Sequence, residues 1–338
     1  MNAPRPGPRP EHATQQDVAE AAGVSRGLVS LALKGEGRMS PETRRRIIET
    51  ARRLHYRTNT AAAELASRRS LRLAAIVPYL DNPFFDLVLR ALRRSAAQAG
   101  YILTAFVSDL SDRVESSTVD DVLSLRPEGL ILPGTSMSAE RLDELAALVP
   151  LVVMDRDLES DTVSVVRLNE THAAGLIVDH LRAQGVRHLI YFGPASALHE
   201  TLVDERRGAC RAAAQHAGLG FTSVVCEDGA SPALRHARDR AGEGFAAITY
   251  NDVLALDVHT ALLSAGLRPG DDVALASYDN SPLARRQEFS LTSIDQSPDR
   301  LAAESVAALL RPRDAPAVHI TVPARLEVRA SSLVGTPR

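Results

Sequence analysis

The chain has 338 residues, 45% of them hydrophobic and 24% charged, which is typical of a soluble globular protein and too apolar for a disordered one. No uncharged run approaches the ~18 residues that a membrane-spanning helix needs, and the N-terminus lacks the apolar stretch of a secretory signal. Two cysteines, Cys210 and Cys226, are too few for a disulfide framework or a zinc site, so we expect a cytoplasmic protein.

The charge is distributed unevenly, although the net charge is only −3. Residues 1–70 carry 12 Arg and one Lys against seven Asp and Glu, whereas the remaining residues carry 26 Arg against 35 Asp and Glu. A basic N-terminal part on an acidic body suggests that only the N-terminal part contacts a polyanion. A solvated run of charges would give the same composition, so charge alone leaves both interpretations open.

The first ordered element is expected just after a Pro-, Arg- and Gly-rich tail, residues 1–12, which we expect to be disordered. Thr14 and Asp17 have the spacing of a capping box and predict a helix over 15–22. Gly23 ends that helix, because glycine supplies the positive φ that a tight turn requires.

Two more helices follow in the basic segment. Ser25 is the expected N-cap of a second helix over 26–33. Ser40, as an N-cap followed by Pro41 at the first helical position, predicts a third helix that reaches about Leu54. Apolar residues spaced to bury one face complete a small three-helix domain.

From residue 71 the pattern changes to strands that alternate with amphipathic helices, which predicts parallel sheets covered on both faces. The expected strands are 72–78, 101–107, 129–132, 150–154, 188–192, 221–226, 245–249 and 272–277. The expected helices are 84–99, 112–125, 139–147, 169–184, 204–217, 231–241 and 252–265. The stretch 155–168 looks irregular and falls midway, which favours two similar α/β lobes over one large sheet.

Two helices joined at Gly23, the second of them polar, are typical of a helix-turn-helix, whose second helix enters the DNA major groove. We expect Arg26 to pair with a guanine there, with Gly27 beside it at the base edges. Phosphate contacts, which fix register without reading sequence, are expected from Thr14, Ser25, Ser30, Lys34, Arg38, Tyr56 and Asn59. The same geometry also occurs in structural αα corners.

The segments DVAEAAGVSRGLVSLALKG, MSPETRRRI and LHYRTNTAAAELASRRS together resemble the DNA-binding head and hinge of lactose-repressor-type (LacI/GalR) regulators. Collinear, individually weaker matches continue through the body. They are IVPYLDNPFF (76–85), VVMDR (152–156), ERRGACRAA (205–213), TYNDVLALDV (249–258), SYDNSPLA (277–284), LTSIDQ (291–296) and RLEVRASS (325–332). The resemblance therefore covers nearly the whole chain.

For the N-terminal part, the resemblance implies a dimer that binds a palindromic operator in double-stranded DNA, with a hinge that folds into a helix on DNA. Leu65 matches the leucine that relatives insert into the minor groove, where such a wedge kinks the duplex. The chain departs from many relatives at Leu31, where an arginine is common. Leu31 offers only apolar contact, for instance to a thymine methyl group, so base reading depends more on Arg26.

The resemblance implies an N-terminal all-α helix-turn-helix headpiece and hinge helix, followed by an α/β core like that of periplasmic sugar-binding proteins, with two lobes of parallel sheets. The expected boundaries are 1–12 for the tail, 13–57 for the head, 58–70 for the hinge, 71–168 plus about 296–318 for the first lobe, and 169–293 plus about 324–338 for the second.

In the cleft between such lobes, the matching positions imply an effector site. Its residues are Asn82, Phe84, Asp155, Arg206, Asn251, Asp279 and Gln296. Most of them follow strands, at the edge where open α/β sheets bind ligands. Carboxylates, amides and an arginine suit polyols, because each hydroxyl both donates and accepts. We therefore expect Arg206→Ala to keep operator binding and lose the effector response.

Some of these residues have structural alternatives. Asp252 is better explained as a charge at a helix N-terminus than as a ligand contact. Asp155 and Arg156 could instead pair structurally across the lobes, and Phe84 could belong to the core.

Three departures from sugar-binding relatives put a standard hexose in doubt. Leu168 and Tyr79 stand where relatives often have Asp, and 227–236 lacks an aromatic residue that stacks on ligand in some members.

No phosphate loop, dinucleotide fingerprint, nucleophile elbow or zinc-protease motif is present, so we expect no enzyme, no cofactor and no metal site. The expected function is a ligand-responsive transcription regulator of the repressor type, a homodimer whose effector is a sugar or a related polar metabolite. One alternative is a regulator that needs a nucleobase-like corepressor. Another is a constitutive, architectural DNA-binding protein with a vestigial cleft.

Overall fold

The computed structural model describes residues 13–56, 69–108, 112–194, 200–242 and 244–334, and the chain divides into two compact units, residues 1–70 and 71–338. The expected tail and nearly all of the expected hinge, including Asn59 and Leu65, lie outside the described residues.

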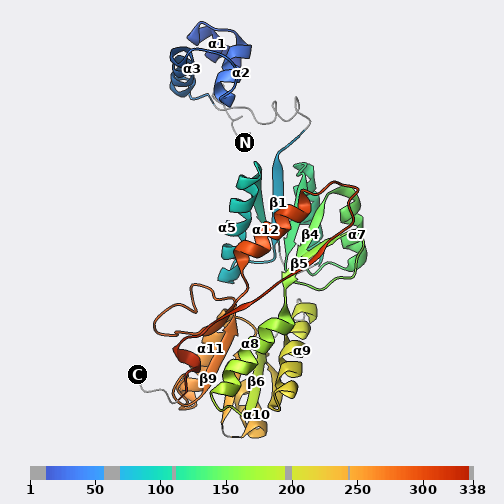
Figure 1. Ribbon diagram of the computed structural model, residues 1–338, viewed down its shortest axis with the longest axis vertical. Helices are drawn as coiled ribbons and strands as arrows, with labels where there is room; N and C mark the ends of the chain where they lie inside the picture. Colours follow the sequence, from blue (N-terminus) through green and yellow to red (C-terminus); the bar gives the residue numbers. More distant parts are fainter. Residues whose placement is uncertain (1–12, 57–68, 109–111, 195–199, 243, 335–338) are drawn as a thin grey trace, which may run out of the picture. The chain divides into compact units, whose positions relative to one another are not determined.

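The first unit is a bundle of three helices (Figure 1). They are α1 (Gln15–Ala22), α2 (Arg26–Lys34) and α3 (Pro41–Arg53), each within about a residue of the expected bounds. The Thr14 and Asp17 capping box is present, and Gly23 has φ 63°. Val18, Val29 and Ile47, one from each helix, are fully buried and form the core of the bundle.

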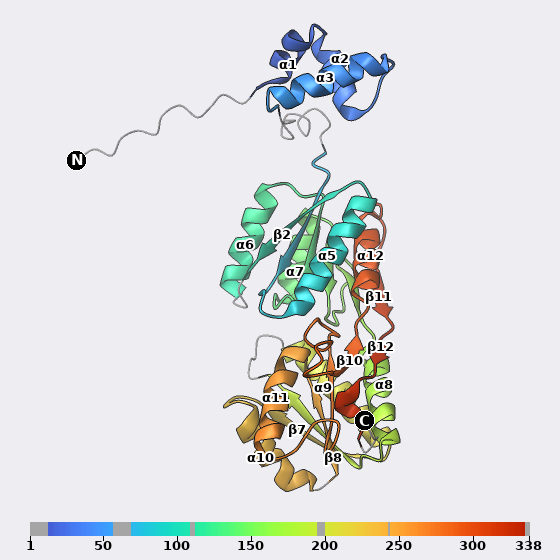
Figure 2. The same ribbon diagram turned by 90° about the vertical axis from the view of Figure 1, so that its left-hand side faces the viewer.

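The second unit contains two α/β lobes, each built on a six-stranded sheet (Figures 1 and 2). The first lobe contains β1 (Arg72–Val77), α5 (Pro83–Gln98), β2 (Ile102–Val107), α6 (Asp112–Ser124), β3 (Gly129–Pro133), α7 (Ala139–Leu148), β4 (Leu151–Met154), β5 (Ser164–Leu168), α12 (Pro298–Leu309) and β11 (His319–Val322). The second contains α8 (Glu170–Ala183), β6 (His188–Gly193), α9 (Glu200–His216), β7 (Gly220–Val225), α10 (Ala230–Ala241), β8 (Phe245–Thr249), α11 (Asp252–Ser264), β9 (Ala274–Tyr278), β10 (Thr292–Asp295), β12 (Arg325–Glu327) and the 3₁₀ turn η2 (Ala330–Ser332).

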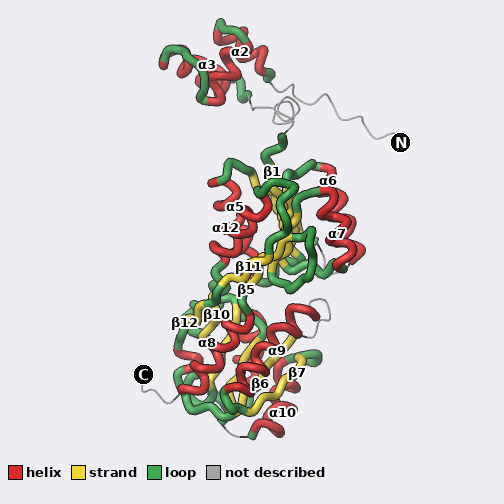
Figure 3. The backbone as a smooth tube through the Cα atoms, turned by 45° about the vertical axis from the view of Figure 1, so that its right-hand side comes forward, coloured by secondary structure: helices red, strands yellow, loops and turns green. Residues whose placement is uncertain are grey.

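The strand order is β11-β5-β4-β3-β1-β2 in the first lobe and β12-β10-β9-β8-β6-β7 in the second. Every pairing is parallel except that of β10 with β12. Helices cover both faces of each sheet, as Figure 3 shows, so the central strands are buried on both sides and are nearly continuous apolar runs. Two apolar clusters per lobe, one on each face of the sheet, form the core.

The expectation of an irregular stretch at 155–168 was wrong at its end, because it contains β5, the strand between β4 and β11. The short run SVVRL became a strand because two neighbours pair with it and bury its apolar residues.

The expected element set also omitted β10, β11, β12 and α12, which lie in the returning C-terminal chain. That chain passes from β10 in the second lobe to α12 and β11 in the first, and back to β12. Strand β11 lies between the two C-terminal ranges expected for the lobes and pairs with β5 of the first. Within the described ranges, no helix is both long and apolar enough to cross a bilayer.

Candidate nucleic-acid interface and ligand pocket

Helix α2 is amphipathic and leaves one polar face exposed. Val29 and Ala32 are buried against the other helices, whereas Arg26, Gly27 and Lys34 are exposed. The Ser25 hydroxyl caps the helix by accepting a hydrogen bond of 3.3 Å from the N–H of Leu28. The two helices are therefore joined as a helix-turn-helix requires, and the start of α2 is open to solvent.

Leu31 lies on the same face but is only 38% exposed, because its side chain packs on the turn after α2. A Cβ on Gly37 would lie 3.0 Å from the Leu31 side chain, and Gly37 also has φ 77°. Any larger residue at position 37 would displace Leu31. Leu31 therefore packs against the turn after α2 and also presents apolar surface to solvent.

The expected phosphate-binding residues differ in how free their side chains are. The Thr14 hydroxyl is engaged with Asp17 in the capping box, and Tyr56 is half-buried against the core of the bundle. Ser25, Lys34 and Arg38 are exposed, and Ser30 is half-exposed on α2.

Arg44 has a role that the sequence did not reveal. Its guanidinium donates to the carbonyls of Ala32, Glu36 and Gly37 at 3.2, 2.9 and 3.1 Å, so it joins α3 to the end of α2. Arg44 lies in a run of three arginines, and only the packing of α3 shows which of them points inward.

We expect Arg44→Ala to destabilise the three-helix bundle by about 1–2 kcal/mol, because three carbonyls lose a charged donor. Hydrogen exchange of the α2 amides in the full chain measures this, and they should exchange about 5- to 30-fold faster. Arg45→Ala, which removes an exposed neighbour, is the matched control. Equal exchange in the two variants would contradict the assigned role.

In the second unit, all seven expected effector residues line one small pocket of about 30 Å³ between the two lobes. Tyr79, Phe85, Gly134, Leu202 and Tyr250, which were not in the expected set, line it too. The set comes from both lobes and from the crossing chain, so the pocket exists only where the lobes face each other.

Two of the pocket's carboxylates occupy equivalent positions in the two lobes. Asp155 directly follows β4 and Asp279 directly follows β9, the third strand in each sheet order. Both have left-handed backbone conformations, with φ 63° and 102°. Such φ values are uncommon outside glycine and occur most often at functional sites, and here they turn each aspartate at its strand end.

The two carboxylates have different hydrogen-bond environments. Asp279 accepts bonds from Asn82 at 3.1 Å and Gln296 at 2.6 Å, which occupies both of its oxygens. Asp155 is 6% exposed, and its Oδ1 has no hydrogen-bond partner in the part of the chain that the structure describes. Burial raises the pKa of each carboxyl group to about 7, although the positive charge of Arg206 acts to lower it.

Arg206 is held in the wall of the pocket by a buried ion pair. It donates to both oxygens of Glu170, at 2.7 to 3.2 Å, and to the carbonyl of Tyr250 at 2.8 Å. Its guanidinium also stacks on the rings of Tyr250 and Tyr278. Only 3% of the side chain of either ion-pair partner is exposed, so the pair is structural, and Glu170 is a residue that the sequence reasoning missed.

The two pocket asparagines are helix N-caps. Oδ1 of Asn82 accepts from the N–H of Phe84, and Oδ1 of Asn251 accepts from that of Leu254. The amide nitrogen of Asn82 is taken by Asp279, while that of Asn251 has no partner among the described residues. Phe84 is both core and pocket lining, since it is 4% exposed and packs with the first lobe.

The structure also shows what Asp252 and Arg156, for which structural roles were considered, contact. Asp252 is buried and accepts hydrogen bonds from the Ser281 N–H at 2.7 Å and the Ser293 hydroxyl at 2.8 Å. These bonds fix the loop after β9 to the start of α11. Arg156 donates to the carbonyl of Met137, and no Asp155–Arg156 pair is present in the described chain.

Two aromatic residues that line the pocket, Tyr79 and Tyr250, were not predicted from the sequence as site residues. Tyr250 directly precedes Asn251, and Tyr79 was noted only as a departure from relatives. Tyr79 packs edge-on against Phe85, with ring centroids 5.1 Å apart. Both rings line the pocket, which gives it aromatic surface as well as the two aspartates.

Comparisons with known proteins agree with both units. Residues 14–59 match the family described as "Bacterial regulatory proteins, lacI family", and residues 178–332 match "Periplasmic binding protein-like domain". The chain is 30% identical over 333 residues to the HTH-type transcriptional regulator PtxS of Pseudomonas putida, with 95% of this chain and 96% of the relative covered.

Two solved structures share the fold. The lac repressor dimer bound to operator and the anti-inducer ONPF has a TM-score of 0.78 at 22% identity, over 96% of this chain and 100% of that chain. A complex of the transcriptional regulator CelR with cellobiose has a TM-score of 0.69 at 23% identity, over 95% and 100%. These relatives by sequence and by fold are transcriptional regulators rather than enzymes.

Proposed function

Because this chain belongs to the lacI family of bacterial regulatory proteins, and is therefore a ligand-responsive DNA-binding regulator of transcription, we propose that it is a repressor controlled by a small polyhydroxylated molecule in the pocket between its lobes. Two copies bind a palindromic operator through their helix-turn-helix units and through hinges that carry Leu65. The effector binds two arrangements of the lobes unequally and so shifts their populations.

The polar face of α2 supports the operator-binding part of this proposal. Arg26 is exposed at the first position of the helix, with Gly27 and the N-cap Ser25 beside it, and Lys34 and Arg38 are exposed at and beyond the other end of the helix. The N-terminal residues of a recognition helix reach base edges, and exposed hydroxyl and basic groups suit phosphates.

We expect Arg26→Ala to weaken binding to the specific operator by about 5- to 150-fold, because a bidentate pair with guanine discriminates by ~1–3 kcal/mol. Binding to unrelated DNA should fall by far less. Fluorescence anisotropy with both duplexes at one fixed salt concentration measures the ratio. Arg235→Ala, which removes an exposed arginine from the second unit, should bind both duplexes as the wild type does.

The observation that carries the effector assignment is the complementary pair of free groups in the pocket. The free Oδ1 of Asp155 accepts a hydrogen bond, and the free amide nitrogen of Asn251 donates one. A hydroxyl group does both, and the aromatic wall of Tyr79 and Phe85 suits the apolar face of a sugar ring. The cellobiose complex of CelR is a precedent in the same fold.

The test is a thermal-shift screen of the full chain against sugars, sugar acids, polyols and nucleobases, followed by operator titrations with each hit. A ligand at 100 times its Kd stabilises by ~2.7 kcal/mol, enough to raise Tm by several degrees. A polyhydroxylated hit that weakens operator binding supports the proposal. A nucleobase hit that tightens it, or no hit with operator binding intact, would instead support the corepressor or the constitutive alternative.

A further inference from the structure

A second cavity, of about 540 Å³, lies where the two lobes and the crossing chain meet. It is lined by α5, by the loop after β9, by the start of α12 and by the segment between β11 and β12. Asp279 lines this cavity as well as the effector pocket, so the two share a wall. We call it the crossover pocket.

The crossover pocket is basic. Five arginines line it against three aspartates, in a second unit that is acidic as a whole. The arginines are Arg90, Arg94, Arg285, Arg300 and Arg325. Three of them have carboxylate neighbours, because Arg90 pairs with Asp86, Arg94 with Asp299 and Arg300 with Glu304.

The other two arginines, Arg285 and Arg325, have no carboxylate within ion-pair distance among the described residues. Arg325 lies opposite Asp295 in the β10–β12 ladder, which would be the natural partner. No ion pair between the two side chains is present in the described chain, and the oxygens of Asp295 accept instead from the amide of Asn280 at 2.8 Å and the N–H of Ser297 at 2.7 Å. Among the described residues, Arg285 donates to the carbonyl of Asn280, at 3.3 Å.

A third cation adds to this excess of positive charge. Arg329 donates to the side chain of Asn280 and to the carbonyl of Leu291, both at 2.6 Å. Burial lowers its pKa most; the negative charges of Glu327, Asp252 and Asp295 raise it, whereas the positive charge of Arg285 lowers it. Arg285 and Arg329 therefore repel each other across Asn280, and a bound anion would relieve that repulsion.

We propose that the crossover pocket binds a phosphorylated small molecule, held through its phosphate group by Arg285 and Arg325. Guanidinium groups match phosphate oxygens with paired, charge-assisted hydrogen bonds. The volume is in the range of small-molecule sites, and the walls come from four chain segments, so a compact metabolite fits better than an extended polymer. This site differs from the effector pocket in charge and in the ligand it accepts.

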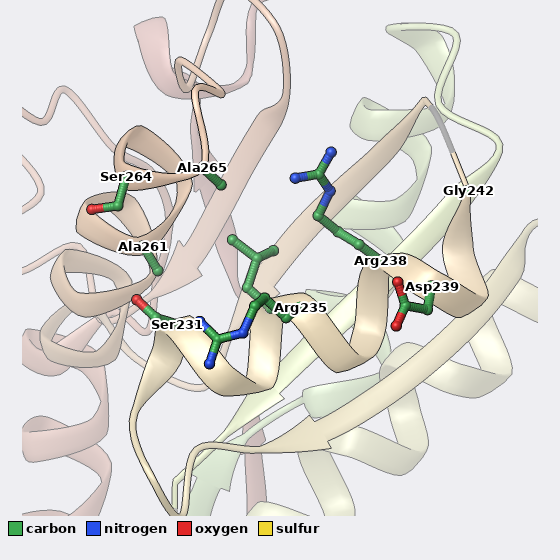
Figure 4. Close-up of a pocket in the computed structure, with 9 residues that line it drawn as sticks. Ser231, Arg235, Arg238, Asp239, Gly242, Ala261, Ser264 and Ala265 are labelled. Carbon is green, nitrogen blue, oxygen red and sulfur yellow. The ribbon is translucent and has the colours of Figure 1, made fainter.

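A second surface of the same unit that carries arginines serves as the control for the crossover pocket. The groove between α10 and α11 is lined by Arg235 and Arg238 on one side and by Ser264 and Ala265 on the other (Figure 4). All of its residues come from the second lobe. Its arginines are as exposed as Arg285 and Arg325, but the groove holds no comparable cluster of cations.

The experiment measures Tm of the full chain without DNA, in 10 mM pyrophosphate or glycerol 3-phosphate and in sodium chloride of matched ionic strength. Both phosphate compounds should raise Tm relative to chloride, and glycerol should not. In the double variant Arg285→Gln/Arg325→Ala, calorimetry should show Kd raised by about tenfold or more, because charged hydrogen bonds are lost. The double variant Arg235→Ala/Arg238→Ala should bind as the wild type does.

Circular dichroism and Tm in chloride establish that both double variants fold, as expected for exposed side chains. Equal shifts in phosphate and chloride, or an unchanged Kd in Arg285→Gln/Arg325→Ala, would overturn the proposal. So would binding of a phosphoserine peptide without binding of either small phosphate compound, because the occupant would then be a protein segment. None of these results depends on operator binding or on the effector, so they leave the proposed function untouched.

Discussion

Arg206→Ala is expected to lower the free energy of unfolding of the second unit by about 3–5 kcal/mol, because it leaves Glu170 charged, buried and unpaired. The variant also loses the hydrogen bond to the Tyr250 carbonyl and the stacking on two tyrosine rings. This changes the outcome expected from the sequence, which was a variant with normal operator binding and no response. Loss of the effector response in Arg206→Ala therefore cannot be assigned to ligand contact alone.

Urea unfolding of the full chain, followed by circular dichroism, measures the effect. Arg207→Ala is the matched control, since the one ion pair of Arg207 among the described residues is a partly exposed one with Asp204, and its loss should change stability by less than ~1 kcal/mol. Adding Glu170→Gln to Arg206→Ala should recover part of the loss by removing the buried charge. If Arg206→Ala were no less stable than Arg207→Ala, the structural role of the ion pair would be refuted.

Asp155→Asn is expected to weaken effector binding by about 10- to 100-fold, because a carboxylate is a stronger acceptor than an amide. The same change should stabilise the protein at pH 8. Burial raises the pKa of Asp155 from 3.8 to about 7, so at pH 8 the folded wild type holds an ion that burial disfavours. That rise corresponds to roughly 4 kcal/mol at most, and the buried amide offsets some of the gain.

The pH dependence has a definite sign. Between pH 4 and 7 the folded state holds a proton on Asp155 that the unfolded state has lost, so stability falls as pH rises through this window. Near pH 4 the wild type and Asp155→Asn should therefore be nearly equally stable, and the variant should gain steadily as pH increases from 5 to 8.

Thermal unfolding at pH 5, 6, 7 and 8 provides the comparison, with Asp161→Asn, at an exposed position of the same lobe, as control. A difference between wild type and Asp155→Asn that stays constant with pH would show that the carboxyl titrates normally. Operator affinity without effector should be unchanged in both variants.

Most of the local structure could be predicted from the sequence. The capping box of Thr14 and Asp17, the turn at Gly23 and the caps Ser25 and Ser40 all depend on neighbouring residues only, and each formed as expected. The central strands were equally clear, because doubly covered parallel strands are continuous apolar runs.

The C-terminal crossings were not predicted, because their strands are short and acquire their order from partners far away in the chain. Strand β11 is ordered by β5, and β12 is ordered by β10. A four-residue strand has too few alternating positions to be recognised alone. These crossings are what bring Gln296 and Arg325 to the region between the lobes.

The sequence by itself determined the helix-turn-helix, the α/β class of the second unit and the seven residues that line the effector pocket, because each follows from a local pattern or a matching motif. Only the tertiary structure decided how those residues are used. There Arg206 pairs with Glu170, Oδ1 of Asp155 has no hydrogen-bond partner among the described residues, and Arg325 forms no ion pair with Asp295 in that part of the chain. Hydrogen-bond partners and burial depend on side chains that meet across up to two hundred residues of sequence, and no local pattern encodes those meetings.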